Sequence, residues 1–194
     1  MQSSCIQIGH RGCSPYYDNT LESIKQACDR SSGCEMDLRL TLDNKIVLIH
    51  DEIILGTKLL VNNCTYEEIK NINKDIILLE DILNNINSKI LCLDIKDNDI
   101  NILKELSILL GKYNENCNLI LIGAWNKNNL DYINNDKILS QYKTCLITED
   151  ILLFPLILEA DIISLRYDLI TSEIIKIVHG LGKYICAWTV NSKK

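Results

Sequence analysis

The stretch CEMDLRLTLDNKIVLIH, residues 34–50, holds two apolar runs joined by a short polar turn. In the first run the side chains alternate, so Glu35, Asp37 and Arg39 share one face of a strand while the apolar residues share the other. A turn this short predicts that the second run, 46–50, pairs antiparallel with the first. A half-buried strand can carry acids on its wet face for solubility alone, so these carboxylates by themselves assign no function.

Around this stretch, short runs of isoleucine, leucine and valine alternate with longer segments of helical period, and no linker rich in glycine, proline or serine divides the chain. The pattern predicts one α/β domain over residues 1–194. The expected strands are Ile6–Gly9, Cys34–Thr41, Ile46–His50, Ile90–Ile95, Leu119–Gly123, Thr144–Ile147, Ile162–Ser164 and Tyr184–Trp188. The expected helices are Leu21–Arg30, Glu80–Ile86, Asn98–Lys112, Lys127–Asn134 and Thr171–Leu181.

Candidate catalytic residues lie where two of these apolar runs stop. His10 and Arg11 directly follow the first run, and His50 with Asp51 follows the third. The C-terminal ends of strands are where open α/β and barrel folds build their sites. Two imidazoles close to the carboxylates of residues 35–37 therefore indicate phosphate-ester chemistry at a metal.

A further strand, 90–95, brings an acid and a base to one side. Asp94 and Lys96 stand two residues apart, so both project to the same face of an otherwise apolar strand. Burying such charges is costly unless they are paired or bind something. The two residues form either a mutual ion pair or a metal ligand beside a phosphate ligand, and the sequence leaves both interpretations open.

The composition narrows the class of partner. A net charge of −6 at pH 7 argues against nucleic-acid binding, which needs a basic surface. The longest apolar run, residues 151–158, is too short to span a membrane, and the first residues do not resemble a signal peptide. The nine cysteines are scattered without a C-x-x-C pair, which predicts mostly buried, reduced thiols in a cytoplasmic protein. Cys13 alone directly follows a candidate motif, where a nucleophilic thiol is the alternative to a structural one.

Taken in order, the motifs of this chain resemble those of the glycerophosphodiester phosphodiesterase family. The resemblance rests on His10-Arg-Gly12, Asp18-Asn-Thr-Leu-Glu-Ser23, Gly33-Cys-Glu-Met-Asp-Leu-Arg-Leu-Thr41, Val47-Leu-Ile-His-Asp51, Thr65-Tyr-Glu-Glu-Ile69, Leu79-Glu-Asp-Ile-Leu83, Asp94-Ile-Lys96 and Ala187-Trp-Thr-Val-Asn191. These motifs keep the family's order and spacing over nearly the whole chain.

The resemblance implies a fold, a reaction and a metal. The fold is a TIM-like (β/α) barrel with its site at the C-terminal ends of the strands. The reaction is the metal-dependent hydrolysis of a small-molecule glycerophosphodiester to glycerol phosphate and an alcohol. Glu35, Asp37 and Asp94 match the family's metal-binding acids, and such hard oxygen ligands suit Mg²⁺ or Ca²⁺.

The resemblance also implies roles for five further residues. Arg11 and Lys96 would hold the phosphate oxygens, one as a planar fork and the other as a point charge. His10 and His50 would be the acid/base pair, because imidazole can give or take a proton near neutral pH. Trp188 matches an aromatic residue at the pocket rim, although a plain core tryptophan is an equal alternative.

Some positions depart from the family pattern. Asp18 and Asp94 stand where the family usually has the longer glutamate, and the family usually continues past Asn191 with another helix and strand. The alternative function is therefore a degenerate member that binds a phosphodiester or a partner without turnover. A lipid-directed phosphodiesterase is a third hypothesis, but it would need an exposed apolar or basic loop at the site, which the sequence does not indicate.

The same comparison predicts a barrel that is incomplete at its C-terminal unit. Seven strand positions of the family can be placed in order, and the last of them is Tyr184–Trp188. Unpaired edges between this strand and Ile6–Gly9 would expose backbone groups and apolar interior. We therefore expect a partner to cover the open edge, with a homo-oligomer as the leading hypothesis.

Overall fold

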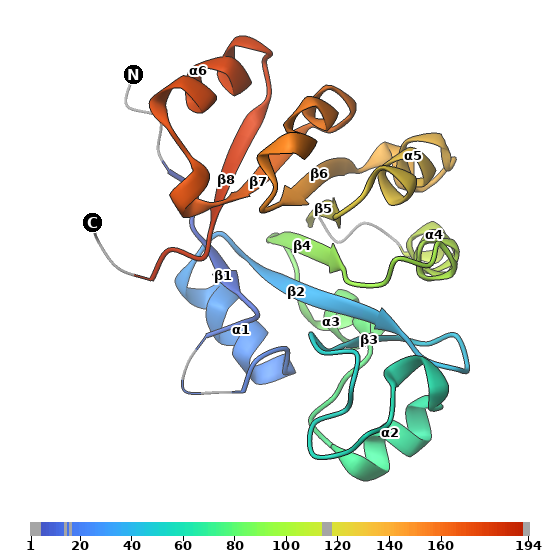
Figure 1. Cartoon of the computed structure of the whole chain (residues 1–194). Helices are drawn as coiled ribbons and strands as arrows, with labels where there is room; N and C mark the ends of the chain where they lie inside the picture. Colours follow the sequence, from blue (N-terminus) through green and yellow to red (C-terminus); the bar gives the residue numbers. More distant parts are fainter. Residues whose placement is uncertain (1–4, 14, 16, 114–117, 192–194) are drawn as a thin grey trace.

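The computed structural model describes residues 5–13, 15, 17–113 and 118–191, and it is an α/β fold on one curled sheet (Figure 1). Seven strands form the parallel part of the sheet, in the order β1 (Ile8–His10), β2 (Gly33–Leu40), β4 (Ile90–Ile95), β5 (Leu119–Ala124), β6 (Lys143–Thr148), β7 (Ile162–Arg166) and β8 (Tyr184–Trp188). Within the described residues, β8 and β1 are the two ends of this order and form no ladder with each other. The predicted incomplete TIM-like barrel is confirmed.

The antiparallel pair predicted from the opening stretch is also confirmed. β3 (Ile46–Leu48) pairs antiparallel with β2, with Leu38 opposite Leu48 and Leu40 opposite Ile46. Several predicted strand boundaries were wrong by one or two residues, and two of these errors concern candidate site residues. β3 ends before His50, which lies in the following loop, and β1 includes His10 but not Ile6.

Helices cover the outer side of the curled sheet (Figure 1). The five that the periodicity predicted are α1 (Leu21–Arg30), α3 (Leu79–Asn85), α4 (Asn101–Lys112), α5 (Lys127–Asn135) and α6 (Ser172–Gly180). The periodicity did not predict α2 (Tyr66–Ile72) or the 3-10 segments η1 (Val61–Asn63), η2 (Leu139–Gln141), η3 (Ile151–Glu159) and η4 (Tyr167–Leu169). These segments are either short or, like η3, apolar without a helical period. In the described part of the chain, no helix is long and apolar enough to cross a membrane.

The main core lies between the sheet and the helices. Met36 and Leu38 of β2 and Leu91 and Leu93 of β4 are fully buried there. Because successive side chains of a strand alternate, the acids of β2 and β4 project from the opposite, inner face. Burial of each large apolar side chain contributes roughly 1.5–3 kcal/mol, so the outer face stabilises the sheet and leaves the inner face free for chemistry.

The described cysteines are all free thiols, as expected, but their burial varies. Cys28, Cys34, Cys64 and Cys145 are buried, whereas Cys13, Cys92 and Cys186 are half-buried and Cys5 is exposed. The expectation that most would be buried is therefore only partly met. Cys117 lies outside the described residues.

Candidate active site

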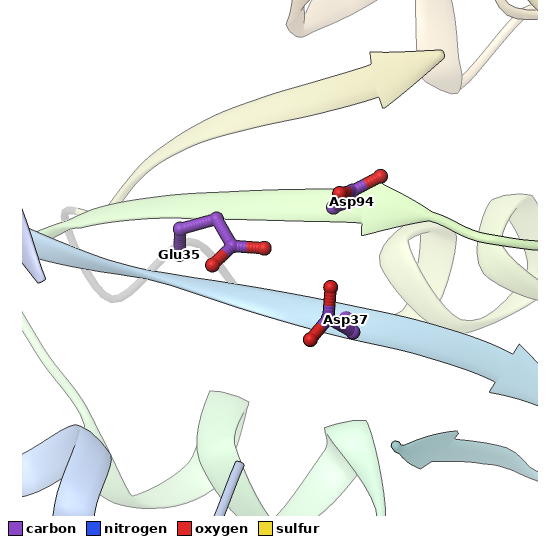
Figure 2. Close-up of side chains that lie close together, drawn as sticks. All are labelled: Glu35, Asp37 and Asp94. Atoms are coloured by element: carbon purple, nitrogen blue, oxygen red, sulfur yellow. The ribbon is translucent and has the colours of Figure 1, made fainter. Parts of the chain in front are cut away.

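Three carboxylates converge on the inner face of the sheet. Glu35 and Asp37 come from β2 and Asp94 from β4, and Figure 2 shows them side by side on these adjacent strands. The register places Asp37 directly beside Asp94. One oxygen of each carboxylate lies within 4.8 Å of the others, close enough to share a cation.

Glu35 is the least satisfied member of this group. Its Oε2 accepts a hydrogen bond from the Arg11 backbone N–H at 3.0 Å, but its buried Oε1 has no hydrogen-bond partner among the described residues. Burial, and then the charges of Asp37 and Asp94, raise the pKa of Glu35 well above its usual value. An uncompensated carboxylate of this kind favours a cation at the same place.

Asp37, in contrast, is heavily supported. Asn19 donates from Nδ2 to Oδ2 at 2.8 Å and accepts the Asp37 backbone N–H at 3.1 Å, while Arg11 Nε lies 3.0 Å from Oδ2. Burial opposes ionisation, but Lys96, Asn19 and Arg11 together lower the pKa of Asp37. Asn19 was not predicted as a site residue. Its position directly after Asp18 in a family motif was the available signal; Asp18 itself is exposed, whereas Asn19 is buried.

Lys96 follows β4 and its ammonium group bridges two of the carboxylates. Nζ lies 2.5 Å from Asp94 Oδ2 and 3.0 Å from Asp37 Oδ1. Burial lowers the pKa of Lys96, but the two carboxylates outweigh it and raise the pKa above its usual value. For Asp94, burial is the larger effect and raises the pKa. The mutual ion pair that the sequence left open is thus present, and it lies inside the acidic group.

The loop after β1 turns sharply to bring Arg11 to the acids. Arg11 and Gly12 both have positive φ, 57° and 112°, and a Cβ at Gly12 would lie 2.2 Å from Ser23 Oγ. Only glycine fits so close to α1, and a positive φ at a non-glycine residue such as Arg11 costs energy that is stored mostly at functional sites. His10, at the end of β1, has its Nε2 3.9 Å from Glu35 Oε2. Burial and the adjacent Arg11 charge lower the pKa of His10.

His50 lies in the loop after β3, and two neighbours hold it. Its Nδ1 lies 2.7 Å from Asp51 Oδ1, and its carbonyl accepts a hydrogen bond from Arg39 Nε at 2.9 Å. Arg39 also binds Asp97 at 2.8 Å. Beside His50 is an open cleft of about 480 Å³, lined by Arg39, His50, Asp51, Glu52, Ile53, Ile54, Leu55, Gly56 and Thr57.

One tryptophan contacts Asp94, and a second tryptophan contacts the first. Trp125, which directly follows β5, donates from Nε1 to Asp94 Oδ1 at 2.6 Å. Trp188 ends β8, donates to the Ser164 carbonyl at 3.1 Å and meets the Trp125 ring edge-on at 5.7 Å. Trp125 was not predicted as a site residue, although its position directly after an apolar strand was a usable signal.

The donor set fits a hard divalent cation. Glu35, Asp37 and Asp94 offer carboxylate oxygens only, and the buried Glu35 Oε1 has no other partner in the described part of the chain. Fully ionised, as metal ligands are, the three carry three negative charges, which Arg11 and Lys96 offset with two positive charges. One uncompensated negative charge therefore remains.

Comparisons with known proteins identify a family and the fold. Residues 10–142 match the model of the glycerophosphoryl diester phosphodiesterase family. A glycerophosphodiester phosphodiesterase from Thermotoga maritima is 21% identical, with a TM-score of 0.81 over 98% of this chain and 88% of that one. An Oleispira antarctica phosphodiesterase, solved with its product sn-glycerol-3-phosphate, is 17% identical, with a TM-score of 0.83 over 95% and 84%. No curated protein sequence is significantly similar to the chain.

Proposed function

Because the chain belongs to the glycerophosphoryl diester phosphodiesterase family, we propose that it hydrolyses glycerophosphodiesters with a divalent cation, Mg²⁺ or Ca²⁺, held by Glu35, Asp37 and Asp94. The products are glycerol phosphate and an alcohol. The observation that carries the proposal is the convergence of these three carboxylates beside two cationic side chains. The product bound to the Oleispira antarctica phosphodiesterase supports the substrate class.

The charge balance supports this substrate. Three carboxylates with Arg11 and Lys96 leave one negative charge, and a divalent cation changes this to one positive charge. A phosphodiester carries one negative charge, so the loaded site and the substrate neutralise each other. When bound, the cation supplies charge stabilisation to the phosphate oxygens.

Arg11 and Lys96 hold the phosphate in this proposal. Arg11 presents a rigid planar fork from the loop after β1, and its Nε lies 3.0 Å from Asp37 Oδ2. Lys96 carries a mobile ammonium group, which can leave its carboxylates once their charge is compensated.

His10 and His50 move the protons. Burial and the adjacent Arg11 charge lower the pKa of His10, which favours the neutral imidazole that a base needs to accept the proton of the attacking hydroxyl of the glycerol. His50, oriented by Asp51, would return a proton to the leaving alkoxide. The phosphorus–oxygen bond to the alcohol breaks as the cyclic phosphate forms, and water then opens the ring. The leaving alcohol would occupy the cleft beside His50. The role of Trp188 as a pocket-rim residue stays a prediction, because Trp188 does not line this cleft.

The test is incubation of the full chain with glycerophosphocholine and either Mg²⁺ or Ca²⁺, followed by measurement of released glycerol phosphate. We expect turnover that EDTA abolishes and that added cation restores. Asp37→Asn should remove it, whereas Asp29→Asn, an exposed acid on α1, should not. Turnover that resists EDTA, or that survives Asp37→Asn, contradicts the proposal.

One observation favours the second candidate, a binding module without turnover. The Lys96 ammonium group lies between Asp37 and Asp94, where it already neutralises part of the acidic group. A module of this kind would bind a phosphodiester in EDTA and release no product. Calorimetric titration with glycerophosphocholine in EDTA separates the two functions.

We also propose that a second copy of the chain covers the open edge of the sheet, in a cytoplasmic protein with reduced thiols. The proposal rests on two observations. Among the described residues β1 and β8 form no ladder with each other, and Ile6 and Tyr184 near these edges are 61% and 68% exposed. Light scattering during size exclusion tests this proposal, and a monomer at micromolar concentration would contradict it.

A further inference from the structure

We infer that Trp125 is a positioning residue for both Asp94 and Lys96: its indole N–H fixes the carboxylate, and its ring face holds the ammonium group. The inference rests on the proposed function and adds to it a residue that touches neither the phosphate nor the alcohol. Four contacts carry it, and they connect β4 to β7 and β8 across the inner face of the half-barrel.

The first contact sets the orientation of Asp94. Trp125 Nε1 donates to Oδ1 at 2.6 Å, while Lys96 binds Oδ2, so each oxygen of Asp94 has one donor and keeps free lone pairs. Aspartate is one methylene shorter than glutamate and reaches less far from its strand. A donor that comes from the neighbouring strand fixes such a short carboxylate without competing for all of its lone pairs.

The second contact is between the Lys96 ammonium group and the face of the Trp125 ring. Its Nζ lies 4.9 Å from the centroid of the Trp125 ring, within the range of a cation–π interaction. An ammonium group that leaves Asp94 and Asp37 for a phosphate oxygen therefore remains attracted to the ring. The ring restricts Lys96 to the inner face without removing its charge.

The Trp125 indole packs against Trp188. Trp188 meets the Trp125 ring edge-on at 5.7 Å and 71°, and Trp188 Nε1 donates to the Ser164 carbonyl of β7. Gly123, which pairs with Asp94, offers no side chain at that level of β5, and Trp125 is the next residue on the same face. These contacts from Trp125 through Trp188 to Ser164 of β7 therefore orient the Asp94 carboxylate.

The experiment compares two replacements of Trp125 with one of Trp188 in the full chain. Trp125→Phe keeps a ring face but removes the donor, whereas Trp125→Leu removes both. Calorimetry with Ca²⁺ or Mg²⁺ alone should show cation affinity reduced by roughly 10- to 100-fold in both Trp125 variants, as for other lost outer partners of ligands. Only Trp125→Leu should also raise KM for glycerophosphocholine, by about two- to fivefold, because only it loses the ring beneath Lys96. Trp188→Phe keeps an aromatic ring edge against Trp125 but loses the hydrogen bond to Ser164, so its cation affinity should fall less than that of Trp125→Phe.

A measurement that needs no variant at Trp125 covers the case in which those variants fail to fold. Trp125 and Trp188 are the only tryptophans, so Trp188→Phe leaves Trp125 as the sole indole. Its emission should change on titration with Ca²⁺, with a midpoint that equals the calorimetric Kd. Unchanged emission overturns the inference.

The outcomes separate this inference from the proposed function. A native protein that binds neither ion refutes both. Native binding that Trp125→Phe leaves undiminished refutes the positioning role alone. Equal KM values for Trp125→Phe and Trp125→Leu refute the role of the ring face.

Discussion

Replacement of Glu35 by glutamine should stabilise the cation-free protein while it abolishes cation binding. The Glu35 carboxylate has a buried oxygen without a partner in the described part of the chain and lies within 4.8 Å of two further acids. Glutamine has nearly the same shape, keeps an oxygen for the Arg11 N–H, and offers its amide N–H groups to the neighbouring carboxylates.

The magnitude follows from these contacts. Two unit charges 4.8 Å apart repel by about 3–4 kcal/mol at an effective dielectric constant near 20, and the cationic side chains offset part of this. An unsatisfied buried acceptor costs roughly 1–3 kcal/mol. The pKa of Glu35 is raised, so the repulsion acts only at a pH high enough to ionise it without the cation. At such a pH we expect Glu35→Gln to raise the free energy of unfolding by about 1–3 kcal/mol in EDTA, which is roughly 2–12 °C in Tm for a chain of this length.

The assay is thermal and urea unfolding of both proteins, first in EDTA and then with excess Ca²⁺ or Mg²⁺. The native protein should gain about 2.7 kcal/mol when the cation is at 100 times its Kd, and the variant should gain nothing. Glu67→Gln, an exposed acid on α2, is the matched control and should change stability by less than about 0.5 kcal/mol.

One result would refute the reasoning. If Glu35→Gln is no more stable than the native protein in EDTA, the carboxylate is not under electrostatic stress. The acidic group would then be a satisfied structural network, and the binding-module function would gain support.

Other predictions concern the acid/base pair, the support of Asp37 and the ion pair between Lys143 and Asp161. His10→Ala and His50→Ala should each lower kcat by about 10²–10⁴ with little change in Tm, and a parallel loss of Tm and activity would mark them as core residues instead. Asn19→Ala should weaken cation binding by roughly 10- to 100-fold in calorimetry, because Asp37 loses its amide partner; unchanged affinity would refute that role. Burial raises the pKa of Asp161, but the Lys143 ion pair and the hydrogen bonds to the carboxylate outweigh burial and the net pKa is lowered. The stability that Asp161 contributes is therefore present above the unfolded pKa of about 3.9 and is lost as pH falls through the lower folded pKa. Asp161→Asn should therefore cost about 1 kcal/mol in urea unfolding at pH 7, and the cost should disappear as pH falls below the folded pKa of Asp161; a pH-independent difference would contradict the assignment.

The strands show how much of the fold could be predicted from local pattern. Ile90–Ile95 and Tyr184–Trp188 were predicted to the residue, because each is an apolar run with polar or glycine neighbours. The parity of β2 was also sufficient to separate its buried residues from its acids, and the short turn after it fixed the antiparallel β3. The predictions failed where no period exists, as in η3, whose residues are nearly all apolar.

The candidate site divides in the same way. The sequence by itself determined which chemical groups are available, since the acids, imidazoles and cations lie in short motifs at the ends of apolar runs. The tertiary structure alone decided which of them meet. Asp94 reaches Glu35 and Asp37 only because β4 pairs with β2 in one register, and Trp125 reaches Asp94 only because β5 pairs with β4. Such contacts join residues about 30 to 60 positions apart, and their register is set by the packing of the whole sheet against its helices, which no local pattern encodes.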